Sequence, residues 1–119
     1  TDGPSAGVAM TTAIVSALTG VAVSGQVAMT GEVSLRGRVL RIGGLKEKVL
    51  AAYREGMERV LIPEGNREQI EEIPAEVLNK VDVIPVSHMD QVLRLALVSV
   101  PSRATVLSDV ESEVPQSAN

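Results

Sequence analysis

Two kinds of side chain in this sequence could together attack an acyl group: a serine near its start and a pair of lysines farther along. Ser5 follows the turn-forming run Asp2-Gly3-Pro4 and comes directly before a long apolar stretch. A hydroxyl at the beginning of a helix lies near free backbone N–H groups, which can stabilise the oxyanion formed when an acyl carbon is attacked. Serine is also common there as a helix cap, which is the simpler interpretation of this stretch alone. Ser5 is therefore either a cap or a nucleophile.

A nucleophilic serine needs a base, and the candidates are one histidine and two lysines. A surface position is the simple explanation for His88, because no carboxylate nearby in the sequence would orient it. Lys46 and Lys48 lie in the first turn of a helix expected after Gly43-Gly44, where the positive end of the helix dipole disfavours a charged ammonium. Two residues apart on a helix, they face different sides, so one site can use only one of them. The direction of the apolar residues favours Lys46, and solvent exposure of both remains the simple interpretation.

The composition excludes several classes of function. With 119 residues, the chain is one domain or a piece of one, and its core must be aliphatic because it has no Phe, no Trp and one Tyr. The absence of cysteine excludes disulfides, thiolate metal sites and a cysteine nucleophile, and permits an intracellular location. A net charge of −4 and the absence of an aromatic stacking platform argue against a nucleic-acid surface.

The pattern along the chain alternates between helix and strand. The apolar run 6–23 contains Thr11, Thr12, Ser16 and Thr19, so we expect a helix buried in a soluble domain rather than a membrane or export segment. The expected helices cover 6–18, 45–55, 66–71, 74–79 and 88–98, with Asn66 and Ser87 as caps, and the expected strands cover 27–35, 38–42, 59–62 and 81–86, with a hairpin turn at Arg36-Gly37. This order predicts an α/β fold, a layered mixed sheet with helices.

The two ends of the sequence indicate how its domain is organised. Residues 99–119 are polar and rich in Pro and Ser, which predicts a disordered C-terminal tail. The first helix has no strand before it to pack on, so we expect residues 1–98 to be the later part of a larger domain whose upstream part is missing.

Three segments in this order, DGPSAG, VAMTGEVSLRGRVLRIGGLKEKVLAAYREG and VLIPEGNREQIEEIP, resemble the proteolytic domain of the Lon proteases. The resemblance covers residues 1 to about 98 and implies the fold of that domain. It implies that the serine of PSAG, Ser5, is the nucleophile and that the second lysine of GGLKEK, Lys48, is the base. It also implies that Thr30 of AMTGE lies beside the lysine, and that backbone N–H groups near Gly3 and Ala6 hold the oxyanion.

The resemblance further implies a cytoplasmic serine endopeptidase with a Ser-Lys dyad that cleaves unfolded or damaged proteins, without a metal or cofactor in the chemistry. ATP and Mg²⁺ are expected only for the ATPase module of the full-length protein, because this chain has no G-x-x-x-x-G-K-[ST] motif. The expected partners are polypeptide substrates and further copies in a six-membered ring, and neither membrane nor nucleic acid. The alternative is an inactive assembly fragment of that ring, for which Arg36, Arg38, Arg41 and Glu32 are either a subunit contact or a solvated surface.

Overall fold

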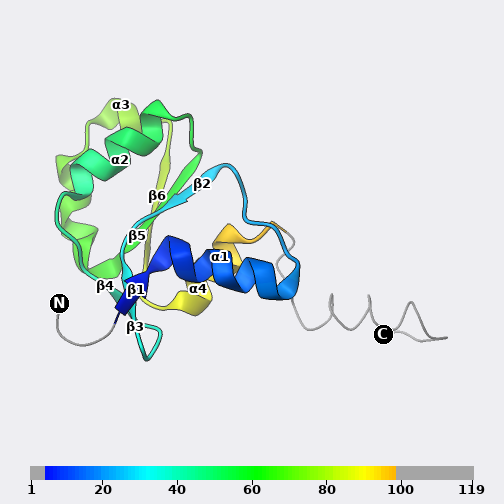
Figure 1. The fold of residues 1–119 in the computed structure, drawn as a ribbon. Coiled ribbons are helices and arrows are strands. Elements are labelled where there is room, and N and C mark those ends of the chain that lie inside the picture. Colours follow the sequence, from blue (N-terminus) through cyan, green and yellow to red (C-terminus); the bar gives the residue numbers. More distant parts are fainter. Residues whose placement is uncertain (1–4, 99–119) are drawn as a thin grey trace, which may run out of the picture.

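The computed structural model describes residues 5–98, with the backbone alone at Ser5. Two three-stranded sheets and their helices form a mixed α/β fold, which confirms the predicted fold class (Figure 1). The elements in chain order are β1 (Ser5–Gly7), α1 (Val8–Thr19), β2 (Val27–Met29), β3 (Glu32–Ser34), β4 (Val39–Leu40), α2 (Leu45–Arg54), β5 (Arg59–Pro63), the 3₁₀-helix η1 (Glu64–Glu72), α3 (Ala75–Leu78), β6 (Asp82–Val86) and α4 (Met89–Ala96). The predicted tail, residues 99–119, lies outside the described residues.

The parallel sheet has the order β2-β5-β6, and helices cover both of its faces. Its central strand β5 is apolar because a strand in that position is buried on both sides. Leu61 packs into a cluster with residues of α1 and α4, whereas Val60 and Ile62 belong to a second cluster with residues of α2 and α3. Figure 1 shows these two pairs of helices on opposite sides of the sheet.

The antiparallel sheet has the order β1-β3-β4, and its β3–β4 hairpin turns at Arg36-Gly37 as predicted. Gly37 has a φ of 84°, and its N–H donates to the carbonyl of Ser34 over 2.9 Å. The hairpin is also attached to the start of α4, because the N–H of Met89 donates to the carbonyl of Gly37.

The predicted strand 27–35 is wrong as a single element. It consists of β2 and β3, which belong to different sheets. The chain changes direction at Gly31, whose φ of 125° is closed to most other residues. Thr30 and Gly31 therefore form the connection between the two sheets.

The first helix differs from its prediction at its start and in its burial. It begins at Val8, after a short strand that contains Ser5, and its N-cap is Gly7, so the interpretation of Ser5 as a helix cap is wrong. Of its residues only Val8 and Thr12 are buried, and the exposed large apolar side chains on it are Met10, Ile14 and Leu18. The hydroxyl of Thr12 donates to the carbonyl of Val8, which lets a polar residue occupy the buried side.

Two predicted caps are also wrong. Asn66 lies inside η1 rather than at its start, and Ser87 precedes α4 by two residues. The cap of α4 is His88, whose Nδ1 accepts the N–H of Asp90 over 3.1 Å. The other predicted elements are present with ends that differ by at most two residues, as is usual for helix and strand boundaries.

Candidate active site

Thr30 lies where β2 ends, and neighbouring backbone groups hold it on both sides. Its own N–H donates to the carbonyl of Leu61 on β5 over 3.1 Å. The carbonyl of the next residue, Gly31, accepts the N–H of Val8 at the beginning of α1 over 2.9 Å. The half-buried Thr30 is therefore fixed between the central strand of the parallel sheet and the segment that follows Ser5.

The two lysines lie at the beginning of α2, after the Gly43-Gly44 pair. Gly44, with a φ of 70°, is the residue before the helix, and its carbonyl accepts the N–H of Lys48 over 3.2 Å. Both lysine side chains are exposed, so the apolar direction that favoured Lys46 does not bury it. The buried side of α2 consists of Leu45, Val49 and Ala52.

A cleft of about 270 Å³ lies between α2 and the parallel sheet, and it distinguishes the two lysines. Lys48 lines this cleft together with Thr30, and Lys46 is not among its lining residues. The rest of the lining is mainly apolar and comprises Ala28, Met29, Ala51, Ala52, Glu55 and Val60. The structure thus brings Lys48 and Thr30, two of the residues named from the sequence, to one surface depression.

Ser5 is placed by its backbone, which pairs with Ser34 of β3, and its side chain lies outside the described part of the structure. Along an antiparallel pair of strands, opposite residues alternate between two arrangements. In one, their backbone N–H and C=O groups bond to each other across the pair; in the other, these groups point away from the partner strand. The Val8–Gly31 hydrogen bond continues this register, and the N–H of Ser34 donates to Arg38 on the other side of β3. The alternation therefore directs the backbone N–H of Ala6 toward β3 and that of Ser5 away from it. Gly3 lies outside the described residues.

The remaining candidates of the sequence lie elsewhere. His88 caps α4, and its ring lies against Gly37, where an added Cβ would come within 2.8 Å of Nε2. Its Nδ1 lies 3.5 Å from Oδ2 of Asp90, so the expectation that no nearby carboxylate accompanies this histidine is wrong. Arg36 and Arg38 are exposed on the hairpin, whereas Arg41 turns to η1, where Nη1 contacts the Gly65 carbonyl and Glu68 Oε2. Within residues 5–98, Arg41 thus contacts η1, whereas Arg36 and Arg38 lie on the hairpin.

Two of the exposed acidic residues of η1, Glu64 and Glu68, are paired with arginines. The hydrogen bond from Arg67 holds the pKa of Glu64 below its usual value. The pKa of Glu68 is also lowered, first by a backbone hydrogen bond and then by the hydrogen bond from Arg41. Among residues 5–98 there is no group of His, Cys, Asp and Glu side chains that could hold a metal ion. Within the same range, no helix has the length and apolar character needed to cross a bilayer.

The sequence analysis named Asn66 only as a helix cap and missed its burial; it is the one buried side-chain amide of the described chain. It hydrogen-bonds to both backbone groups of Ile42, shortly before α2 begins. Nothing in the local sequence distinguishes it from a surface asparagine, because its partner is 24 positions away.

Comparison with known proteins identifies the protein family of this chain. Residues 1–99 match the family described as the Lon protease (S16) C-terminal proteolytic domain, so the mixed α/β fold is that of a protease domain. The chain belongs to this family.

Curated relatives agree with this assignment. The chain is 60% identical over 100 residues to the Lon protease of Rhizobium meliloti (strain 1021), an alignment that covers 84% of this chain and 12% of that protein. The Lon protease of Azorhizobium caulinodans is 62% identical over the same shares of the two chains. That of Endomicrobium trichonymphae is 52% identical over 108 residues, which are 91% of this chain and 14% of the relative. The chain thus spans about an eighth of the length of the curated relatives that it matches.

Proposed function

We propose that this chain carries the catalytic dyad of a serine endopeptidase, with Ser5 as the nucleophile and Lys48 as the general base. The observation that supports the proposal is the cleft that Lys48 shares with Thr30 and that Lys46 does not line. Thr30 is also the residue before Gly31, whose carbonyl holds the first turn after the Ser5 strand. One short connection therefore relates the lysine cleft to the serine segment.

In the proposed reaction, neutral Lys48 accepts the hydroxyl proton of Ser5 as Oγ attacks the carbonyl carbon of a substrate peptide bond. The oxyanion that forms is held by backbone N–H groups. Lys48 then donates the proton to the leaving amine, the C–N bond breaks, and an acyl ester remains on Ser5. Water, deprotonated by Lys48, attacks this ester, and the proton returns to Ser5 Oγ as the carboxylic acid leaves.

The oxyanion donors named from the family resemblance are the backbone amides of Gly3 and Ala6. The strand register argues for one change to this pair. Because the Ala6 N–H is directed toward β3 and the Ser5 N–H away from it, we favour Ser5 over Ala6 as the donor beside Gly3.

Thr30 is proposed to hold the lysine amine through its hydroxyl. The two side chains line the same cleft, and a hydroxyl can accept a hydrogen bond from an amine while donating its own proton elsewhere. This contact would orient the amine toward the serine.

The biological setting is proposed by analogy with the relatives, which are named Lon protease. The substrates are unfolded or damaged polypeptides, and the protein acts in the cytoplasm as part of a six-membered ring. The chemistry of the dyad uses no metal or organic cofactor. ATP and Mg²⁺ serve a separate ATPase module of the full-length protein.

The alternative is a chain that contributes only to ring assembly. The exposed apolar residues Met10, Ile14 and Leu18 of α1 favour this second function, because a contiguous apolar helix face is typical of an interface. Treatment with a peptide boronate or a serine-reactive phosphonate distinguishes the two. Covalent modification of Ser5, located by mass spectrometry and absent in Ser5→Ala, supports the enzyme. A protein that assembles but is not modified supports the scaffold.

A further inference from the structure

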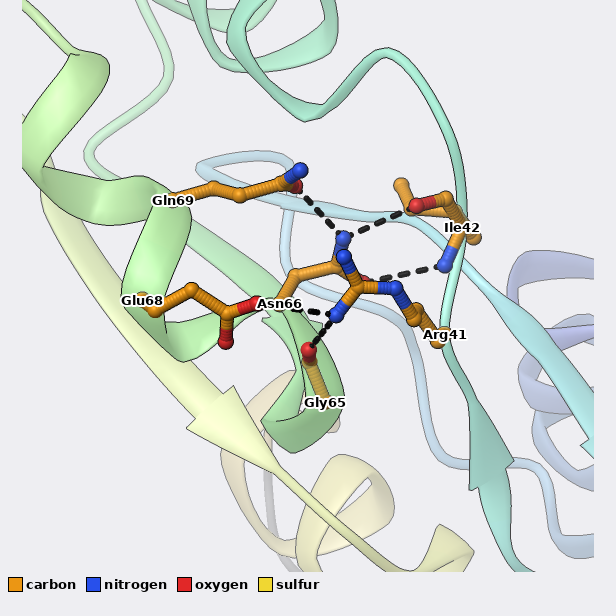
Figure 2. Close-up of polar contacts among 6 residues, drawn as sticks. All are labelled: Arg41, Ile42, Gly65, Asn66, Glu68 and Gln69. Carbon is orange, nitrogen blue, oxygen red and sulfur yellow. Dashed lines mark hydrogen bonds and ion pairs between the residues drawn. The ribbon is translucent and has the colours of Figure 1, made fainter.

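Asn66 is a fully buried polar residue whose side chain is engaged with the backbone before α2. Its Oδ1 accepts the N–H of Ile42 over 3.0 Å, and its Nδ2 donates to the carbonyl of Ile42 over 2.8 Å. Nδ2 also donates to Oε1 of Gln69 over 2.7 Å. Figure 2 shows the amide between Ile42 and Gln69, with Arg41 and Glu68 beside it. We call the pair of hydrogen bonds to Ile42 the Asn66 clamp.

The Asn66 clamp satisfies both polar groups of one peptide residue, as a neighbouring strand would. Loss of this side chain would leave both backbone groups of Ile42 without their observed partner. These hydrogen bonds are partly buried, and backbone groups that lose a partner away from water cost free energy, so the bidentate contact defines the position and the orientation of Ile42 together.

Ile42 is separated from α2 only by Gly43 and Gly44, which are the most flexible residues a chain can contain. Gly44 adopts the left-handed conformation, and its carbonyl accepts the N–H of Lys48. A glycine pair alone would not determine where the first turn of the helix lies. The Asn66 clamp fixes the backbone directly before the glycine pair, and the buried Leu45 anchors the first turn directly after it.

The side of the cleft that carries Thr30 is attached to β5, the strand directly before η1. The carbonyl of Leu61 accepts the N–H of Thr30, and η1, which contains Asn66, follows directly after Pro63. Thr30 and the beginning of α2 are therefore both attached to β5, Thr30 at the middle residue Leu61 and α2 through η1, which follows the strand. Lys48 and Thr30 line one cleft, and each is carried by a segment attached to β5 or to the helix that follows it.

We propose that Asn66 is a positioning residue that sets the amine of Lys48 against Thr30 and Ser5 through Ile42 and the glycine pair. This inference rests on the proposed function, because it assumes that Lys48 is the base. It predicts that loss of the Asn66 clamp affects the proton-transfer step rather than the binding of substrate.

The experiment compares Asn66→Ala with Arg41→Ala in the protein at its natural length. Arg41 is the matched control, because it ties the same chain segment to η1 from the exposed side without touching the backbone of Ile42. Hydrolysis of a small fluorogenic peptide is measured across pH at a temperature where circular dichroism shows both variants folded. For Asn66→Ala we expect kcat to fall by about 10²-fold, with KM changed less than about twofold, as for a misplaced catalytic group.

The pH dependence distinguishes positioning from general loss of structure. A partly unfolded enzyme loses amplitude at every pH, whereas a displaced lysine also moves the acidic limb of the profile. We expect that limb to move in Asn66→Ala and to stay unchanged in Arg41→Ala. A folded Asn66→Ala variant with parental kcat and an unmoved limb would overturn the proposal, as would equal losses in the two variants.

Two further measurements separate this inference from the proposed function. Amide hydrogen exchange at residues 42–48, recorded in a Ser5→Ala background, reports the Asn66 clamp without any catalysis. Faster exchange after Asn66→Ala supports the clamp, and unchanged exchange contradicts it. If Lys48→Ala keeps its activity, the dyad itself is wrong whatever the exchange shows.

Discussion

The backbone N–H of Val8 donates to the carbonyl of Gly31 over 2.9 Å, which attaches the first residue of α1 to the residue after Thr30. Ser5 lies three residues before this hydrogen bond, and Thr30 one residue before its acceptor. The neighbouring N–H of Thr30 donates to Leu61. These backbone hydrogen bonds connect the serine segment to the central strand β5. Thr30, which lies between them, lines the same cleft as Lys48.

Replacement of the proposed nucleophile tests the dyad most directly. We expect Ser5→Ala to abolish peptide cleavage by the full-length protein while its fold and assembly remain intact, because no other group would form the acyl intermediate. The measurement is hydrolysis of a peptide substrate, with size-exclusion chromatography as the control for assembly. Residual cleavage above roughly 1% of the parental rate would contradict the assignment, since loss of a nucleophile costs several orders of magnitude.

The two lysines of α2 form a matched pair for the second prediction. Lys48→Ala should be as inactive as Ser5→Ala, because Lys48 lines the cleft with Thr30. Lys46→Ala should keep most of its activity, because Lys46 is exposed outside that cleft. Peptide hydrolysis by the two variants is compared at equal concentrations of folded protein. An inactive Lys46→Ala beside an active Lys48→Ala would exchange the roles of the two residues.

Thr30→Val removes a hydroxyl from the cleft and keeps the shape of the side chain. We expect weaker catalysis, by about 10-fold to 100-fold as for loss of a positioned group, and a displaced acidic limb in the pH profile of kcat. Thermal unfolding checks that the variant remains folded. A profile with parental height and position would remove Thr30 from the site.

Gly31→Ala tests the connection between the two sheets. A Cβ at this position would lie 3.2 Å from Pro63 Cγ and 3.2 Å from Val39 Cγ1, in a backbone conformation with a φ of 125°. We expect a loss of about 1–3 kcal/mol in the free energy of unfolding, as is typical of strained backbone. Urea denaturation measures it, with Gly25→Ala as the control because a Cβ there meets no atom within 4 Å. Equal effects of the two substitutions would contradict the prediction.

The carboxylates of η1 predict a small acid-dependent loss of stability. The pKa values of Glu64 and Glu68 are lowered in the folded state, so their contribution is present above the usual glutamate pKa of about 4.3 and is lost as the pH falls through the lower folded values. The double variant Glu64→Gln/Glu68→Gln should therefore show a flatter decrease in stability on acidification. Chemical denaturation at a series of pH values measures this slope. The effect should be modest because both pairs are exposed and screened by solvent.

The sequence by itself determined the fold class, the hairpin turn at Arg36-Gly37 and the approximate order of helices and strands. These features depend on local signals: apolar periodicity, glycine and proline positions, and turn-forming pairs. The candidate residues Ser5, Lys48 and Thr30 also came from sequence, through motifs in a characteristic order. Periodicity alone favoured Lys46, because a helical pattern reports the direction of the core and not the location of a cleft.

Only the tertiary structure decided the features that depend on contacts between distant segments. Ser5 lies in a strand because β3 is available to pair with it, and the break at Gly31 exists because β2 and β3 join different sheets. Lys48 and Thr30 share a cleft because α2 packs over the parallel sheet. Asn66 resembles an ordinary cap in sequence, yet it is buried against Ile42, since the partner of a buried amide is chosen by the path of the whole chain and not by its neighbours.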